Sequence, residues 1–169
     1  WSSHYRYSVD TVACVIAAIS PQCEWSRNLI IADDILAERG VSVGGAIHAF
    51  IRKAEHLRDT DYRSETQTIA TRMFDTFKTG PKVNCFAHNL AGDMNMVTVD
   101  THAAQAGLNN PLANVCLPWT PYRIFAECYV VASNKVNRQP AEFQAIVWHM
   151  WKRLYPRVWK LQERKQWFI

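Results

Sequence analysis

A lysine near the middle of the chain is a candidate nucleophile. Lys82 follows Gly80-Pro81, and because proline suits the first position of a helix, this lysine falls in a helix's first turn. The glycine permits a tight turn before the helix. An amine that attacks carbon must be neutral, and burial beside other cations and the positive end of a helix favours that form. The alternative is an ordinary exposed lysine at the start of a helix.

An aspartate further along the chain is the second candidate for catalysis. Asp100 follows the apolar run 96–99 and precedes the helical sequence THAAQA, so it is suited to cap that helix. A carboxylate in this position is partly shielded, and it can stabilise positive charge on a substrate or assist proton transfer. A simple N-cap is the alternative. The two roles are compatible, because capping fixes the direction of the carboxylate.

Both residues belong to a pattern that resembles the helix-hairpin-helix DNA glycosylase superfamily, of the endonuclease III type. The hairpin-like sequence FKTGPK ends at Lys82, and VDTH at residues 99–102 follows an apolar stretch. Lys82 and Asp100 are separated by 18 positions (100 − 82), the separation expected in that family. Upstream, VIAAISPQ at residues 15–22 resembles the family's apolar first helix, which ends in S-x-Q.

The resemblance implies an activity. Lys82 would attack C1′ of a deoxyribose and expel the base, and the resulting Schiff base would lead to strand cleavage by β-elimination, with Asp100 assisting. Gln22 would fill the gap that the flipped nucleotide leaves in the duplex. Otherwise Gln22 is a polar residue that ends a helix. The expected partner is double-stranded DNA, bound by a monomer.

The hairpin itself is expected to bind a DNA phosphate. Backbone N–H groups at Thr79, Gly80 and the helix start are suited to hold a phosphate oxygen, as helix N-termini do. The family pattern has G-x-G where this chain has Lys78-Thr79-Gly80. Lys78 therefore either adds a positive charge beside the phosphate or makes the hairpin less tight.

Three more residues are candidates for the base pocket. Cys23 and Trp25 follow Gln22 directly, although core packing is an equally good interpretation of Trp25. His102 is the last residue of VDTH. His102 and His88 have no third ligand at metal-binding spacing, so we expect polar or capping roles for both and predict no metal site. The four closely spaced cysteines of relatives with an iron–sulfur cluster have no counterpart after Cys128, so no cofactor is predicted.

The elements that must position these residues are predicted to be helices. We expect an all-α, two-lobed fold with the active site in the cleft between a helical-barrel lobe, 10–97, and a second lobe, 1–9 plus 98–169. Expected inward faces in the second lobe are Ile124, Phe125, Cys128 and Val131 on one helix, and Phe143, Ile146, Val147, Met150 and Leu154 on the next. Helices are predicted near 10–19, 24–39, 46–57, 64–77, 82–90 and 120–136, and from Pro140 onward.

Composition and charge indicate which binding partners and which cellular location suit this chain. The chain has 169 residues, a formal net charge of +4 and a pI of about 8.9, which permits nucleic acid as a partner without requiring it. Its 5 cysteines form no C-x-x-C pair, so a reducing, cytoplasmic location in a prokaryotic or phage-infected cell is expected. The apolar run 12–19 is shorter than the ~20 residues that span a bilayer, so no membrane association is predicted.

Two alternatives to a glycosylase stay open from the sequence. One is a phage-type enzyme on the same fold that modifies bases or nucleotides. The other is a non-catalytic helix-hairpin-helix module that only binds DNA. A module of that kind needs neither Lys82 nor Asp100, and a substrate panel of free nucleotides and duplex DNA separates the two enzyme classes.

Overall fold

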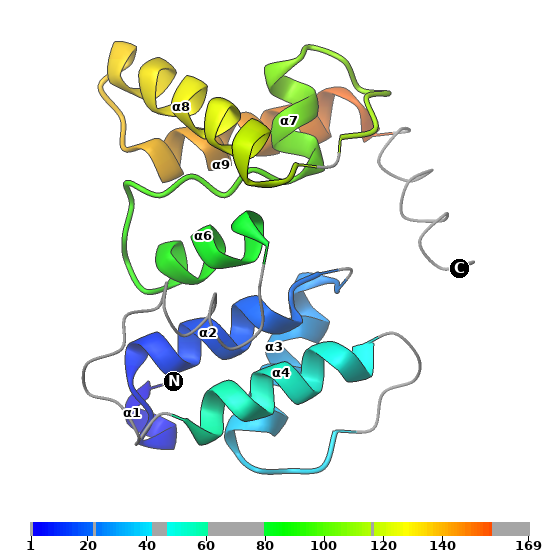
Figure 1. Cartoon of the computed structure of the whole chain (residues 1–169), viewed down its shortest axis with the longest axis vertical. Helices are drawn as coiled ribbons and strands as arrows, with labels where there is room; N and C mark the ends of the chain where they lie inside the picture. The colour runs from blue at the N-terminus through cyan, green and yellow to red at the C-terminus, as the bar shows by residue number, and fades with distance from the viewer. Residues whose placement is uncertain (1, 22, 42–46, 61–79, 116, 157–169) are drawn as a thin grey trace. The chain divides into compact units, whose positions relative to one another are not determined.

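The computed structural model describes residues 2–21, 23–41, 47–60, 80–115 and 117–156. Every regular element in these ranges is a helix, which confirms the predicted all-α class for this part of the chain. The helix predicted at 64–77 lies outside the described residues. Figure 1 shows the helices in order: α1 Ser2–Tyr5, α2 Val9–Ile19, α3 Trp25–Leu36, α4 Ile47–Asp59, α6 Pro81–Leu90, α7 Thr101–Gly107, α8 Trp119–Lys135 and α9 Pro140–Leu154.

The chain divides into two compact units, Trp1–Gly92 and Asp93–Ile169. In the first unit, α2 is the central helix and contacts α3, α4 and α6. Every residue of α2 from Thr11 to Ile19 is buried, as its almost continuous apolar sequence predicts. Burying one large aliphatic side chain such as Ile19 stabilises a fold by about 1.5–3 kcal/mol. Packing on this one helix therefore holds α3, α4 and α6 together.

The N-terminal segment differs from the predicted division of the chain. It belongs to the first unit, whereas residues 1–9 were expected in the second lobe. The Tyr5 hydroxyl donates to the Asp33 carboxylate, and the Tyr7 hydroxyl donates to Glu38 at 3.2 Å. Both rings also pack against the first unit's core. Carboxylates at the end of α3 thus provide partners that the sequence pattern did not indicate.

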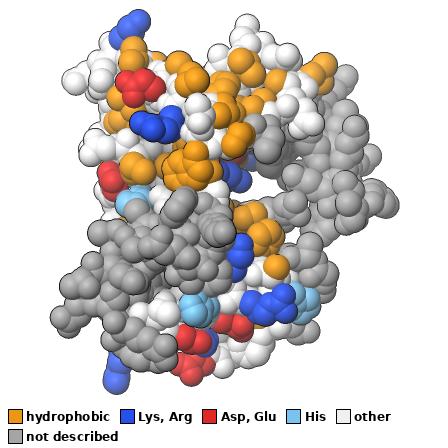
Figure 2. Space-filling model, viewed as in Figure 1, with side chains coloured by type: hydrophobic (Ala, Val, Ile, Leu, Met, Phe, Trp, Pro, Cys, Tyr) orange, Lys and Arg blue, Asp and Glu red, His pale blue; other side chains and the backbone are white. Residues whose placement is uncertain are grey.

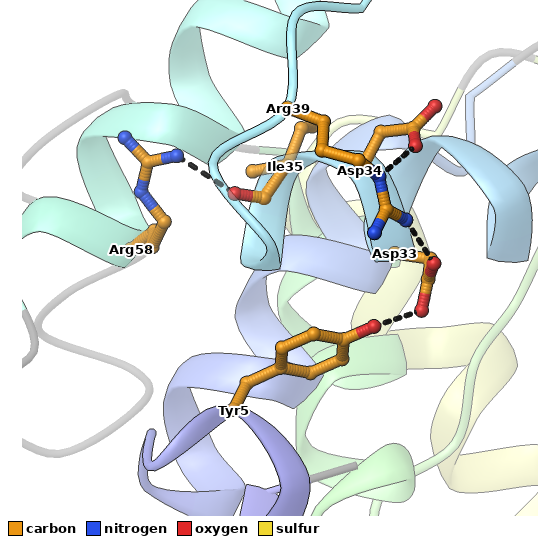
Figure 3. Close-up of polar contacts among 6 residues, drawn as sticks. All are labelled: Tyr5, Asp33, Asp34, Ile35, Arg39 and Arg58. Carbon is orange, nitrogen blue, oxygen red and sulfur yellow. Dashed lines mark hydrogen bonds and ion pairs between the residues drawn. The ribbon is translucent and has the colours of Figure 1, made fainter.

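Polar contacts at the end of α3 reinforce this corner of the first unit, as Figure 3 shows. Arg39 lies between two neighbouring carboxylates, and its Nε is 2.9 Å from Oδ1 of Asp34. From α4, Arg58 donates from Nη1 to the carbonyl oxygen of Ile35 at 2.7 Å. The same carbonyl accepts from the backbone N–H of Glu38 at 3.1 Å, so the arginine adds a second donor to an oxygen in the last turn of α3.

The second unit contains α7, α8 and α9, which contact one another. From α8, the buried residues are Tyr122, Tyr129 and Ser133. The prediction for the buried face of α8 is wrong. Ile124 and Val131 are 63% and 48% exposed, and Cys128 is exposed as well. Tyrosines take the inner positions because their hydroxyl groups bond to backbone groups of 97–103.

The predicted inner stripe of α9 is wrong in the same way. Ile146, Met150 and Leu154 are all exposed, and the buried residues of α9 are Pro140, Ala141, Gln144 and Trp151. The buried face lies about a quarter of a turn from the predicted face on α9 and about a third of a turn from it on α8, so apolar periodicity alone chose the wrong side. Figure 2 shows hydrophobic side chains at the surface over these helices. Among the described residues, no helix is both long and apolar enough to cross a membrane.

Candidate functional site

Lys82 lies in the first turn of α6, as predicted, and is half-buried. The N-cap is Gly80, whose backbone is extended at φ −65° and ψ 161°. The predicted need for glycine's conformational freedom is therefore wrong, because any residue adopts this conformation. Gly80 provides no side-chain cap to the helix, and Pro81 occupies the first turn. The N-cap residue thus leaves the backbone N–H groups at the helix start, beside the lysine, without a side-chain bond of its own.

Phe86, on the same face of α6 as Lys82, belongs to an aromatic pair with Trp25 of α3. Phe86 is one helical turn after the lysine, and residues four apart in a helix are neighbours on its surface. The ring of Trp25, at the start of α3, meets the Phe86 ring edge-on with centroids 6.2 Å apart. Trp25 is 50% exposed, so core packing does not account for it. The first unit therefore presents a lysine with an accessible indole nearby.

Cys23 lies just before the N-terminus of α3 and is half-buried against the core. Burial raises the pKa of its thiol, so the sulfur stays protonated at neutral pH and is suited to line a pocket, not to attack a substrate. The next residue, Glu24, caps α3 by accepting from the backbone N–H groups of Ser26 and Arg27. Hydrogen bonds from Ser26 and Arg27 lower the pKa of this carboxyl.

Asp100 is the N-cap of α7, which confirms that part of the prediction. Its Oδ1 accepts from the backbone N–H of Ala103 at 2.8 Å. Its Oδ2 accepts from the indole Nε1–H of Trp148, on α9, also at 2.8 Å. Each carboxylate oxygen therefore has an N–H donor, and the half-buried group is held in one orientation with an acceptor site left on each oxygen.

The segment 97–99, directly before Asp100, is held by a side chain. The Tyr122 hydroxyl donates to the Val97 carbonyl at 2.7 Å and accepts from the Val99 N–H at 2.9 Å. The second buried tyrosine, Tyr129, donates from its hydroxyl to the Ala103 carbonyl at 2.9 Å. Burial raises the pKa of Tyr129, and the negative charge of Asp100 raises it further. The two phenols thus hold the backbone on either side of Asp100 in place.

His102 lies in the first turn of α7, with its Nδ1 3.1 Å from Oε1 of Gln105. Its ring meets the ring of Trp148 edge-on, with centroids 6.4 Å apart. The buried Gln105 in turn donates to the carbonyl of Ala113 at 3.0 Å. His102 is therefore held beside the indole that bonds to Asp100. In the ranges that the structure describes, no group of three or more His, Cys, Asp or Glu side chains could hold a metal ion.

The predicted site residues thus fall into two groups. Lys82, Gly80, Cys23 and Trp25 belong to the first unit, and Asp100 and His102 belong to the second. Gln22, Lys78 and Thr79 lie outside the described residues. Sequence reasoning missed Phe86, Tyr122 and Trp148. The four-residue spacing from Lys82 could have identified Phe86, but no local signal relates Tyr122 or Trp148 to Asp100.

Comparison with known proteins shows which family the chain belongs to. No curated protein and no solved structure matches the chain. The model of a family of unknown function, DUF7178, matches residues 1–154. Because this match covers most of the 169 residues, the chain belongs to the DUF7178 family.

Proposed function

We propose that this chain is a DNA glycosylase with AP lyase activity, in which Lys82 is the nucleophile and Asp100 assists. The observation that carries the proposal is the Asp100 carboxylate, which two N–H donors orient at the start of α7. Asp100 follows Lys82, in the first turn of α6, at the separation expected in the helix-hairpin-helix glycosylases that the sequence resembles. A carboxylate that only caps a helix needs the backbone N–H but not the indole.

The proposal includes the two-lobed arrangement of that superfamily, in which a flipped nucleotide is bound between the lobes. Lys82 and Asp100 come from different compact units, so this proposal assigns one catalytic residue to each lobe. The uncapped N–H groups at the start of α6 would bind a phosphate of the same strand. The exposed indole of Trp25 would stack on the extruded base, since every base offers a π-face to an aromatic ring.

The chemistry assigned to the two residues begins with attack of the neutral Lys82 amine on C1′. The C1′–N bond breaks, and its electron pair leaves with the base, which is then protonated. Fixed negative charge at Asp100 stabilises the positive charge that develops on the sugar. Ring opening and loss of a proton from nitrogen give the Schiff base. Loss of a C2′ proton then expels the 3′ phosphate and cleaves the strand.

Borohydride trapping tests this proposal directly. The full chain is incubated with a duplex that contains one abasic site, and borohydride reduces any Schiff base to a stable protein–DNA adduct. We expect an adduct from the parent chain and none from Lys82→Ala or Lys82→Gln. Lys53→Ala is the matched control, because Lys53 is a half-buried lysine on α4 of the same unit, and it should retain trapping.

The result also separates the alternatives. An adduct that persists in both Lys82 variants would remove this lysine from the mechanism. No adduct from the parent chain, with duplex binding intact, would point to a glycosylase without lyase activity or to a module that only binds DNA. Turnover of free nucleotides in place of duplex DNA would identify the nucleotide-modifying alternative. A panel of duplexes with modified or mispaired bases then identifies the base that is released.

A further inference from the structure

The indole of Trp148 connects α9 to the start of α7 through one hydrogen bond. Its Nε1–H donates to Oδ2 of Asp100 at 2.8 Å, across 48 positions of sequence. The other oxygen is held by a backbone N–H within α7 itself, at Ala103. One donor leaves a carboxylate free to rotate about its Cβ–Cγ bond. A second donor, on the other oxygen, fixes the plane of the group.

Trp148 is itself held on several sides. The Nζ of Lys152 lies 4.1 Å from the centroid of its ring, within the range of a cation–π interaction. The ring of His102 meets the indole edge-on from α7. The helix that carries Trp148 is anchored near its start, where the Ala141 N–H donates to the Met94 carbonyl at 3.0 Å. The N–H therefore points at Asp100 from a fixed support.

We propose that Trp148 is a positioning residue, whose indole N–H sets the orientation in which Asp100 meets the substrate. This inference rests on the proposed function, because it assigns Trp148 a role only through Asp100. A carboxylate stabilises a developing charge best when it is held in place before the reaction. Misplacing a catalytic group by about 1 Å can lower a rate on the order of 100-fold. The role is therefore specific to base release, the step that Asp100 assists.

The hydrogen bond is tested by NMR on the full chain labelled with nitrogen-15. Trp148→Phe removes the N–H but keeps an aromatic ring for Lys152 and His102, and the lost indole signal assigns the peak. We expect Asp100→Asn to move this Trp148 indole signal. Trp119 is the matched control from the same unit, and its indole signal should move far less. A Trp148 signal that Asp100→Asn leaves unchanged would overturn the proposed contact.

The functional role is tested by comparing two reactions of the same variants. We expect Trp148→Phe to lower the rate of base release on the order of 10- to 100-fold. Duplex binding and borohydride trapping at a preformed abasic site should stay within about twofold, because the base has already left there. Trp119→Phe should leave both rates unchanged. A general loss of folding would lower both reactions together, which overturns a positioning role.

The two proposals fail in different ways. If Asp100→Asn itself releases base at the parent rate, Asp100 is not catalytic and the proposed function is wrong at that residue. If Asp100→Asn loses base release while Trp148→Phe keeps the parent rate, the proposed function stands and the inference on Trp148 is overturned. Loss in both variants, with trapping retained, supports both.

Discussion

The phenol oxygen of Tyr122 accepts a 2.9 Å hydrogen bond from the backbone N–H of Val99, the residue directly before Asp100. The same hydroxyl donates to the Val97 carbonyl at 2.7 Å. One buried side chain of α8 thus satisfies two backbone groups of the segment 97–99, which belongs to no helix or strand. This contact sets where the segment ends and α7 begins, and hence where the Asp100 carboxylate lies.

Tyr122→Phe should therefore destabilise the second unit. It leaves a buried N–H and a buried carbonyl without their partner, at about 1–3 kcal/mol for each unsatisfied group. Urea unfolding measures the change in the free energy of unfolding. Tyr155→Phe is the control, because Tyr155 is only half-buried, and its effect should be much smaller. Equal stabilities for the two variants would contradict the role given to the Tyr122 hydroxyl.

Asp100→Asn should impair base release by at least tenfold while duplex binding stays close to the parent value. The amide keeps an acceptor oxygen for the cap but removes the negative charge that stabilises the sugar cation. Single-turnover base release and a binding titration measure the two effects. Asp93→Asn is the control, since Asp93 caps a different turn by accepting from Asn95. Full base release by Asp100→Asn would exclude a catalytic role.

Trp25→Ala should weaken base release through substrate binding. Stacking of one base on an aromatic side chain contributes about 1–3 kcal/mol. We expect KM to rise while borohydride trapping at an abasic site, where no base is present, stays near the parent level. Trp119→Ala, another exposed tryptophan, should change neither reaction. If Trp25→Ala lowers both reactions equally, the indole supports the fold and does not contact the base.

Replacing Gly92 by alanine should lower the stability of the fold, whereas replacing Gly80 by alanine should raise it. Gly92 follows the C-cap of α6 at φ 103°, and its N–H donates to the Asn89 carbonyl at 3.0 Å. An alanine there is strained, at a cost of about 1–3 kcal/mol. Gly80, at φ −65° with no atom within 4 Å of an added Cβ, should accept alanine with a gain of about 0.4–1 kcal/mol. Thermal unfolding of both variants measures these changes.

High pH should destabilise the second unit through Tyr129. Burial and the charge of Asp100 raise its pKa in the folded chain, whereas the unfolded phenol titrates near its ordinary value of about 10. The stability that this group contributes is fully present below the unfolded pKa and is lost as pH rises toward the folded pKa. Urea unfolding from about pH 9 to about pH 11 should show this decline. Tyr129→Phe should decline less, and identical slopes would contradict the assignment.

The sequence by itself determined the features that depend on nearby residues. The all-α class, for the residues that the structure describes, the beginning of α6 at Pro81, its end before Gly92 and the cap at Asp100 were predicted and are confirmed. Each of these depends on backbone hydrogen bonds and side chains within about four positions, so a single sequence contains the necessary information.

The tertiary structure decided which faces are buried and what surrounds the carboxylate. Apolar periodicity favoured Ile124 and Met150 as core residues. The buried residues are instead Tyr122, Tyr129 and Ser133 on α8, and Pro140, Ala141, Gln144 and Trp151 on α9. The reason is that a buried hydroxyl is tolerated where a backbone group is available to bond with it, and such groups come from distant parts of the chain. Trp148 reaches Asp100 for the same reason. Its partner is 48 positions away, and only folding brings the two together.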